Sequence, residues 1–144
     1  MAMARMEDIG GARVVVSDIR DIERLWAHVK RRSWDITRVR DYIVEPAPSG
    51  YRAVHLVVRK QNRKLEIQLR TRTMHDWADT VEGMGRRLGM ELKSGEGPRN
   101  ILDLLSAIAD INHAVSLGLD PPPEAQAEYD RLLSELQAKG SANG

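Results

Sequence analysis

Two consecutive segments of this chain carry side chains that could do chemistry at every second position. Residues 50–59 read Gly-Tyr-Arg-Ala-Val-His-Leu-Val-Val-Arg, and residues 65–71 read Leu-Glu-Ile-Gln-Leu-Arg-Thr. Successive side chains of a β-strand point to opposite faces, so each segment predicts a strand with one aliphatic and one polar face. A register that pairs the aliphatic sets also gathers the polar ones. The polar set consists of Tyr51, His55, Arg59, Glu66, Gln68 and Arg70.

Two carboxylates in the sequence could hold a metal together. Asp8 precedes the Gly10-Gly11 pair at the start of an earlier predicted strand, and Glu66 lies on the polar face of the second strand above. If these strands are neighbours, the carboxylates converge and suit Mg²⁺ bound with a phosphate ligand, as in phosphoryl transfer. The alternative is that Asp8 caps a turn and Glu66 forms a surface ion pair, and the spacing alone favours this alternative.

Aromatic and basic residues point to a nucleotide, although each also has a simpler explanation. Tyr51 follows Ser49-Gly50, where its ring could stack on a nucleobase. A half-buried strand tyrosine is the alternative. The planar guanidinium groups could bind phosphates, and a solvated charged face is the usual reason for scattered arginines. These arginines are Arg13, Arg40, Arg52, Arg59 and Arg70. Gly10-Gly11 lacks the spacing of a nucleotide-binding loop.

The elements that would position these residues follow from the apolar periodicity. Residues 12–16 predict a buried strand, and residues 19–29 predict a helix capped by Ser17. Residues 36–43 predict a short strand, and Gln61-Asn62-Arg63 predicts the connection of the hairpin. A capping box at Thr73 and Asp76 predicts the start of the next helix.

The remainder of the chain predicts helices only. Residues 101–115 have helical spacing and end at Gly118, and Asp120-Pro121 is a typical start of a last helix. We expect the tail from Gly140 to be disordered. The order predicts an α+β fold, with a small mixed β-sheet, flanking helices and a C-terminal helical extension. We place the catalytic core in residues 1–92 and the extension in residues 93–144.

The composition narrows the class of protein. The chain has 144 residues, a net charge of +1 and no cysteine, which excludes disulfides and thiolate metal sites. It has no apolar run long enough to span a membrane and no signal-peptide core, so we expect a soluble cytoplasmic domain without a membrane partner. His75-Asp76 could suggest a metal-dependent phosphohydrolase, but His28 and His113 lack suitable neighbouring ligands, and we reject that hypothesis.

Four linked motifs have the order and spacing of those in the RelA/SpoT alarmone synthetase domain, and a fifth segment continues the match. The chain resembles this domain over about residues 5–82. The five segments are Met-Glu-Asp-Ile-Gly-Gly-Ala-Arg-Val at residues 6–14, Arg-Asp-Tyr-Ile at 40–43, Pro-Ser-Gly-Tyr-Arg-Ala-Val-His-Leu at 48–56, Glu-Ile-Gln-Leu-Arg-Thr at 66–71 and Met-His-Asp-Trp-Ala at 74–78. The resemblance implies transfer of pyrophosphate from ATP to the ribose 3′-hydroxyl of GDP or GTP, which makes (p)ppGpp in the stringent response.

The resemblance also implies roles for individual residues at the donor and the metal. Asp8 would bind Mg²⁺, and Arg13 would stack on the adenine of ATP. Glu66 would assist the metal or take the proton of the attacking hydroxyl. A ribose hydroxyl is a poor nucleophile, so a nearby carboxylate base helps. Asp8 and Glu66 are therefore the expected catalytic and metal-binding residues.

The acceptor side follows from the same resemblance. Tyr51 would stack on the guanine, and Arg40, His55 and Gln68 would line the acceptor pocket. His75 falls where the family often has an amide that reads guanine.

Two departures from the family pattern shape our expectations. Ala47 stands where the family commonly has a lysine that meets the acceptor phosphates. Only Met1–Glu7 precede the Asp-Ile-Gly-Gly motif, whereas the family domain begins earlier, with basic residues that grip ATP. We therefore expect weak or no turnover without a longer N-terminus. Two alternatives remain: a toxin-type relative that pyrophosphorylates the 3′ end of tRNA, and a non-catalytic guanine-nucleotide-binding module. The sequence leaves a homo-oligomer open.

Overall fold

The computed structural model describes residues 9–32 and 34–142, which divide into two compact units. The first, here called the sheet unit, contains the chain up to Glu45 together with Arg52–His75. The second, the helical unit, contains Pro46–Tyr51 and the chain from Asp76 onward. The sequence boundary proposed between residues 92 and 93 differs from this division, because a short loop and most of one further helix belong with the C-terminal helices.

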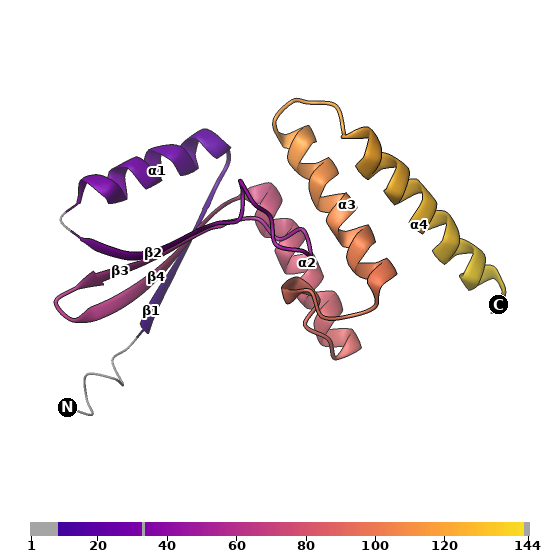
Figure 1. Ribbon diagram of the computed structural model, residues 1–144, viewed down its shortest axis with the longest axis horizontal. Coiled ribbons are helices and arrows are strands. Elements are labelled where there is room, and N and C mark those ends of the chain that lie inside the picture. Colours follow the sequence, from indigo (N-terminus) through magenta and orange to yellow (C-terminus); the bar gives the residue numbers. More distant parts are fainter. Residues whose placement is uncertain (1–8, 33, 143–144) are drawn as a thin grey trace. The chain divides into compact units, whose positions relative to one another are not determined.

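The sheet unit contains a four-stranded mixed sheet (Figure 1). Its strands are β1 (Ile9–Val16), β2 (Asp35–Asp41), β3 (Val54–Lys60) and β4 (Arg63–Thr71), in the spatial order β1-β4-β3-β2. β1 runs parallel to β4, and the other two pairs are antiparallel. Helix α1 (Ile19–Arg31) follows β1 and carries the chain to β2. This mixed sheet with helices confirms the predicted α+β fold class.

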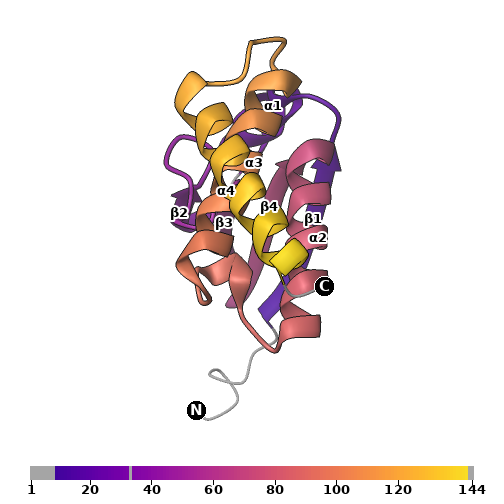
Figure 2. The ribbon, with the colours of Figure 1, turned by 90° about the vertical axis from the view of Figure 1, so that its right-hand side faces the viewer.

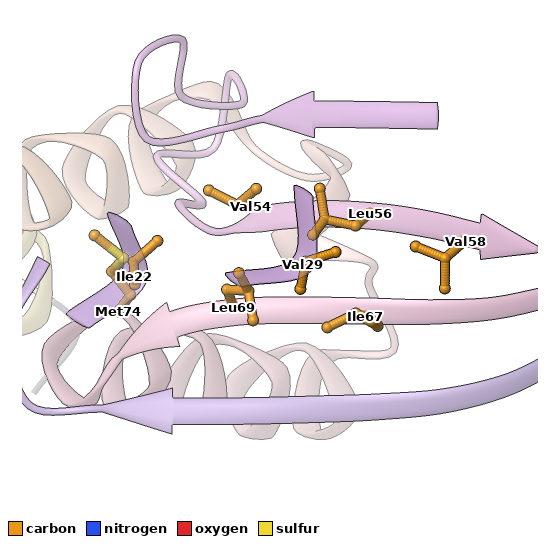
Figure 3. Packing of buried hydrophobic residues seen from close by; sticks show 8 residues of the cluster. All are labelled: Ile22, Val29, Val54, Leu56, Val58, Ile67, Leu69 and Met74. Atoms are coloured by element: carbon orange, nitrogen blue, oxygen red, sulfur yellow. The ribbon is translucent and has the colours of Figure 1, made fainter. Parts of the chain in front are cut away.

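The core of the sheet unit lies on the aliphatic face that the alternation predicted. Figure 3 shows Val54, Leu56 and Val58 of β3 beside Ile67 and Leu69 of β4. Helix α1 adds Ile22 and Val29, and Met74 completes the labelled cluster. Each buried aliphatic side chain contributes about 1.5–3 kcal/mol relative to an exposed one. Because strand side chains alternate, burial of this face fixes the opposite face as the one carrying the polar residues.

The turn between β3 and β4 sets the register of the hairpin. Lys60 pairs with Arg63, so the connection is the two-residue turn Gln61-Asn62, one residue shorter than predicted. Both turn residues have positive φ, 51° for Gln61 and 62° for Asn62. A two-residue turn with positive φ at both positions matches the right-handed twist of the flanking strands. The turn therefore holds Glu66 and Gln68 opposite their β3 partners.

Two helix starts differ from the sequence predictions. Asp18, not Ser17, caps α1, and its carboxylate accepts a hydrogen bond from the backbone N–H of Arg20 at 2.8 Å. Helix α2 (Arg72–Leu88) starts earlier than the Thr73 capping box predicted. The hydroxyl of Thr71 accepts from the backbone N–H of Met74 at 3.3 Å. The capping side chain thus belongs to the last residue of β4, so the strand passes directly into the helix.

The helical unit contains most of α2, a short 3₁₀ helix (Leu92–Ser94), α3 (Arg99–Ser116) and α4 (Pro123–Ala142). Helices α3 and α4 run side by side in Figures 1 and 2. The indole N–H of Trp77 donates to the backbone carbonyl of Leu105 at 3.1 Å, which joins α2 to α3. Helix α4 continues through Ala142, so the expectation of disorder from Gly140 is wrong for residues 140–142. Within the described residues, no helix is long and apolar enough to cross a membrane.

Candidate functional site

A row of four polar side chains crosses all four strands on the face opposite the core. In register, Arg13 of β1 pairs with Gln68 of β4, Gln68 pairs with His55 of β3, and His55 pairs with Arg40 of β2. The Nε of Arg13 donates to Oε1 of Gln68 at 3.3 Å. The sheet therefore brings together four residues that the sequence assigned to nucleotide binding. We call Arg13, Gln68, His55 and Arg40 the polar row.

Glu66 lies in the next row of the same face. It pairs with Gly11 of β1 on one side and with Val57 of β3 on the other. Its Oε1 is 3.7 Å from Nδ1 of His55, and its side chain is 41% exposed, enough to meet a ligand. A depression of about 260 Å³ is lined by Gly11, Ala12, Arg13, Glu66 and Gln68. The absence of a side chain at Gly11 thus leaves space directly beside the carboxylate.

His55 is oriented by groups from β2 and the turn that follows it. The ring of Tyr42 meets the imidazole edge-on, with 5.2 Å between centroids and 76° between planes. The backbone N–H of Tyr42 donates to the carbonyl of Ala53 at 2.8 Å. The carboxylate of Asp41 accepts from the backbone N–H groups of Ile43 and Val44 at 2.9 and 3.1 Å. These bonds fix the backbone at the end of β2 and with it the ring that packs against His55.

His75 lies at the end of the sheet unit, in the first turn of α2. Its Nδ1 is 2.9 Å from Nη2 of Arg70, and the side chain of Arg70 is only 1% exposed. Both residues follow from the local chain path, because β4 ends at Thr71 and α2 begins at Arg72. The structure therefore pairs His75 with a buried cation, which the sequence analysis considered as a phosphate ligand or as part of a solvated charged face.

Tyr51 lies outside the strand on which the alternation placed it. Strand β3 begins at Val54, and Tyr51 ends the loop Pro46–Tyr51 of the helical unit. Its side chain is 6% exposed, so the ring is buried in this structure. The ammonium of Lys93 lies 5.4 Å from the ring centroid and forms an ion pair with Glu82.

The loop that carries Tyr51 is fixed by bonds within the helical unit. The Ser49 hydroxyl donates to the backbone carbonyl of Lys93 at 2.6 Å, and the N–H of Gly50 donates to the carbonyl of Ala47 at 2.8 Å. Gly50 has φ +95°, and a Cβ there would lie 2.8 Å from Cβ of Ala109 and 2.9 Å from Cα of Ser106. The loop backbone therefore touches α3, and only glycine fits the contact.

The second predicted carboxylate, Asp8, lies outside the described residues, so its distance from Glu66 stays a prediction. In the described part of the chain, no three His, Cys, Asp or Glu side chains form a metal-binding group. Glu66 is the carboxylate on the polar face beside the depression. Mg²⁺ is often bound through one or two carboxylates together with substrate phosphates and water, so this donor fits such an ion.

Three contacts of the candidate residues were not predicted from the sequence. They are the ring of Tyr42 on His55, the guanidinium of Arg70 on His75 and the ammonium of Lys93 on Tyr51. The sequence contains a weak indication for Tyr42, because Tyr42 and Tyr51 flank the same loop. The sequence contains no such indication for Lys93, because it lies 42 residues beyond Tyr51 and only the packing of the helical unit brings the two together.

The sequence is similar to a known protein family and to individual members of it. A family model described as "Region found in RelA / SpoT proteins" matches residues 1–85. The chain is 33% identical over 118 residues to GTP pyrophosphokinase YwaC of Bacillus subtilis, covering 75% of this chain and 53% of that protein. It is 38% identical over 146 residues to GTP pyrophosphokinase YjbM of the same organism, covering 93% and 59%. The chain thus spans between half and three fifths of the length of these relatives.

Solved structures show the same fold. The crystal structure of small alarmone synthetase 2 from Bacillus subtilis matches with a TM-score of 0.66 and 31% identity, covering 81% of this chain and 65% of that one. Small alarmone synthetase 1 from the same organism, bound to its product pppGpp, matches with a TM-score of 0.66 and 24% identity. That second match covers 94% of this chain and 65% of that one.

Proposed function

Because the chain belongs to the RelA/SpoT family, we propose that it is a domain of a GTP pyrophosphokinase that uses ATP as donor and GDP or GTP as acceptor. The ribose O3′ of the acceptor attacks the β-phosphorus of ATP. The bond from that phosphorus to the oxygen bridging to the α-phosphorus breaks, and AMP leaves. Two relatives that bear this name, at 33% and 38% identity, support the proposal.

The polar row is the observation that carries the proposal. It holds two guanidinium groups, an amide and an imidazole at one level of a sheet, all on regular strands. Such a row can bind phosphate oxygens and ribose hydroxyls without reorganising when charge develops. Arg13 supplies a planar cation at the donor side, and Arg40, His55 and Gln68 bind the acceptor. Correct placement of both substrates can supply up to about 10 kcal/mol of the barrier reduction.

Glu66 is proposed to take the proton of the attacking hydroxyl. It lies one row from Gln68, is 41% exposed, and lines the depression beside Gly11. The same carboxylate would hold Mg²⁺, with Asp8 as the second ligand that the family resemblance implies. When bound, the ion would neutralise charge on the migrating diphosphate. Nδ1 of His55 lies 3.7 Å from Oε1 of this carboxylate.

Tyr51 is proposed to stack on the guanine. In the structure its ring is 6% exposed, with Lys93 over it, so stacking requires that Lys93 and the other groups covering the ring move away. A lysine over a tyrosine ring contributes about 0.5–2 kcal/mol, which a base stacking on the ring, at about 1–3 kcal/mol, can replace. The buried ring is therefore compatible with this role when a ligand competes for it.

The proposal is tested first by calorimetric titration of GDP and GTP into the purified protein. We expect Arg40→Met and Gln68→Leu each to weaken binding by about tenfold to a hundredfold, because each removes hydrogen bonds to a charged group. Arg63→Met, at the first residue of β4, is the matched control and should leave the affinity unchanged. Equal affinity in all four proteins would contradict the assignment of the polar row.

Binding of the base is tested separately. Tyr51→Leu keeps an apolar side chain but removes the stacking surface, and we expect GDP binding to be lost. Tyr129→Leu on α4 is the control for loss of a tyrosine. Activity is followed as AMP release from ATP and Mg²⁺ with GDP, GTP or tRNA as acceptor. Glu66→Gln should abolish any AMP release that the unaltered chain gives. Release with tRNA but with neither GDP nor GTP would show that the acceptor is the tRNA 3′ end and not a nucleotide.

A further inference from the structure

Arg70 is the most deeply buried cation among the described residues for which an exposure is given. Its side chain is 1% exposed at the end of β4, and its Nε and Nη1 have no hydrogen-bond partner in the described part of the chain. Its Nη2 lies 2.9 Å from Nδ1 of His75. The contact with His75 is therefore the side-chain hydrogen bond that the described residues give this guanidinium.

The chemistry of the two groups decides which atom donates. A guanidinium has five N–H donors, has no acceptor and stays charged in proteins. Nδ1 of His75 must therefore accept, which requires its lone pair. A neutral imidazole carries one ring proton, so that proton lies on Nε2. A doubly protonated ring would place an N–H and a positive charge against the guanidinium.

We propose that Arg70 is a positioning residue that holds His75 as a neutral imidazole whose Nε2–H is a hydrogen-bond donor. The turn from β4 into α2 fixes both side chains, since only five residues separate them. Arg70 itself is too buried to meet a substrate, and it acts through His75. A ligand atom facing Nε2 of His75 must then be a hydrogen-bond acceptor.

This inference deepens the proposed function and, in its second part, rests on it. If Nε2 of His75 faces position 6 of the acceptor base, a donor-only ring selects a purine with an oxygen at that position. Guanine and hypoxanthine carry that oxygen, whereas adenine carries an amino group, which is a donor. A site built to bond one group rejects an analogue that leaves the site's polar group unpaired. The 2-amino group of guanine plays no part in this discrimination.

The first test reads the tautomer directly and needs no substrate. Histidine side-chain ¹⁵N spectra at pH 8 should show His75 with its proton on Nε2 and an unprotonated Nδ1, with His75→Gln providing the assignment. Arg70→Lys keeps a donor and should keep this tautomer, whereas Arg70→Met should give a mixture. A proton on Nδ1 in the unaltered protein would overturn the proposal, even if neither variant folds.

The second test measures base selection by titrating GDP, IDP and ADP. We expect GDP and IDP to bind within about threefold of each other and ADP at least about tenfold more weakly. His75→Phe should remove most of the difference between IDP and ADP. Selection unchanged in His75→Phe would overturn the role in base reading while leaving the proposed function intact. Absence of binding by all three nucleotides would contradict the proposed function, and the tautomer measurement would still decide the role of Arg70.

Discussion

Replacement of Gly50 by alanine tests how the loop Pro46–Tyr51 is held against α3. Gly50 has φ +95°, and an added Cβ would lie 2.8 Å from Cβ of Ala109 and 2.9 Å from Cα of Ser106. The substitution therefore combines two costs. A positive φ costs a residue with a side chain about 1–2 kcal/mol, and a methyl group forced into a packed contact costs about 1–3 kcal/mol more. We expect the helical unit to lose about 2–5 kcal/mol of unfolding free energy.

A matched control separates the two costs. Gly95 has φ +93°, nearly the same φ angle as Gly50, and nothing lies within 4 Å of the position of its Cβ. Gly95→Ala should therefore cost only the conformational part. The difference between the two variants measures the steric contact with α3. Ala109→Gly removes one of the two close atoms, so in the Gly50→Ala background it should restore part of the loss.

The assay must report on the helical unit alone. Trp77 is suitable because its indole N–H donates to the carbonyl of Leu105 at 3.1 Å. Its indole proton resonance can be followed through a urea titration and distinguished from the two other tryptophans by substitution of each with phenylalanine. Equal midpoints for Gly50→Ala and Gly95→Ala would refute the contact between the loop and α3.

Three further predictions concern stability. Leu56→Ala should cost about 2–5 kcal/mol in a denaturant titration, because Leu56 is 0% exposed in the core, whereas Val39→Ala at a 44% exposed position should change stability by no more than about 0.5 kcal/mol. Trp77→Phe removes the donor to an α3 carbonyl and should cost about 1–3 kcal/mol, which the same titration measures. Asp18 caps α1, and the backbone N–H that donates to its carboxylate lowers its pKa below the ordinary 3.8. That stabilisation is present above pH 3.8 and is lost as the pH falls through the lower folded-state pKa, so Asp18→Ala should lower the Tm at pH 7 but not at a pH below both values.

The strand pattern predicted much of the sheet unit for a simple reason. Side chains alternate along a strand, so burial of Leu56 and Ile67 forces His55 and Gln68 to the opposite face. The sequence predicted that these residues share a face, and the register confirms it. The neighbouring position of β1 and β4 was considered only as a condition, and the pairing of Arg13 with Gln68 was not predicted, because no turn connects these parallel strands and fixes their register.

The errors also have physical causes. Ser17 and Asp18 are both good caps, and only the backbone conformation decides which one receives the N–H groups. The alternation that includes Tyr51 begins three residues before β3, and an alternating pattern does not show at which residue strand pairing starts. The contact of Lys93 with Tyr51 depends on how the helical unit packs, which residue spacing along the chain does not reveal. The contact of Arg70 with His75 is local, but it depends on where β4 ends and α2 begins.

The loop Pro46–Tyr51 gives the helical unit two separate pieces of chain, one inserted within the sheet unit's own sequence. A gene fragment ending after His75 would therefore encode Ser49 and Gly50 without the helices that contact them, and one starting at Asp76 would encode those helices without the loop. The helical unit therefore cannot be encoded by one continuous piece of the chain that leaves out the sheet unit. We expect the two units to be inherited together as one continuous segment, with insertions tolerated at the ends of that segment rather than between the two units.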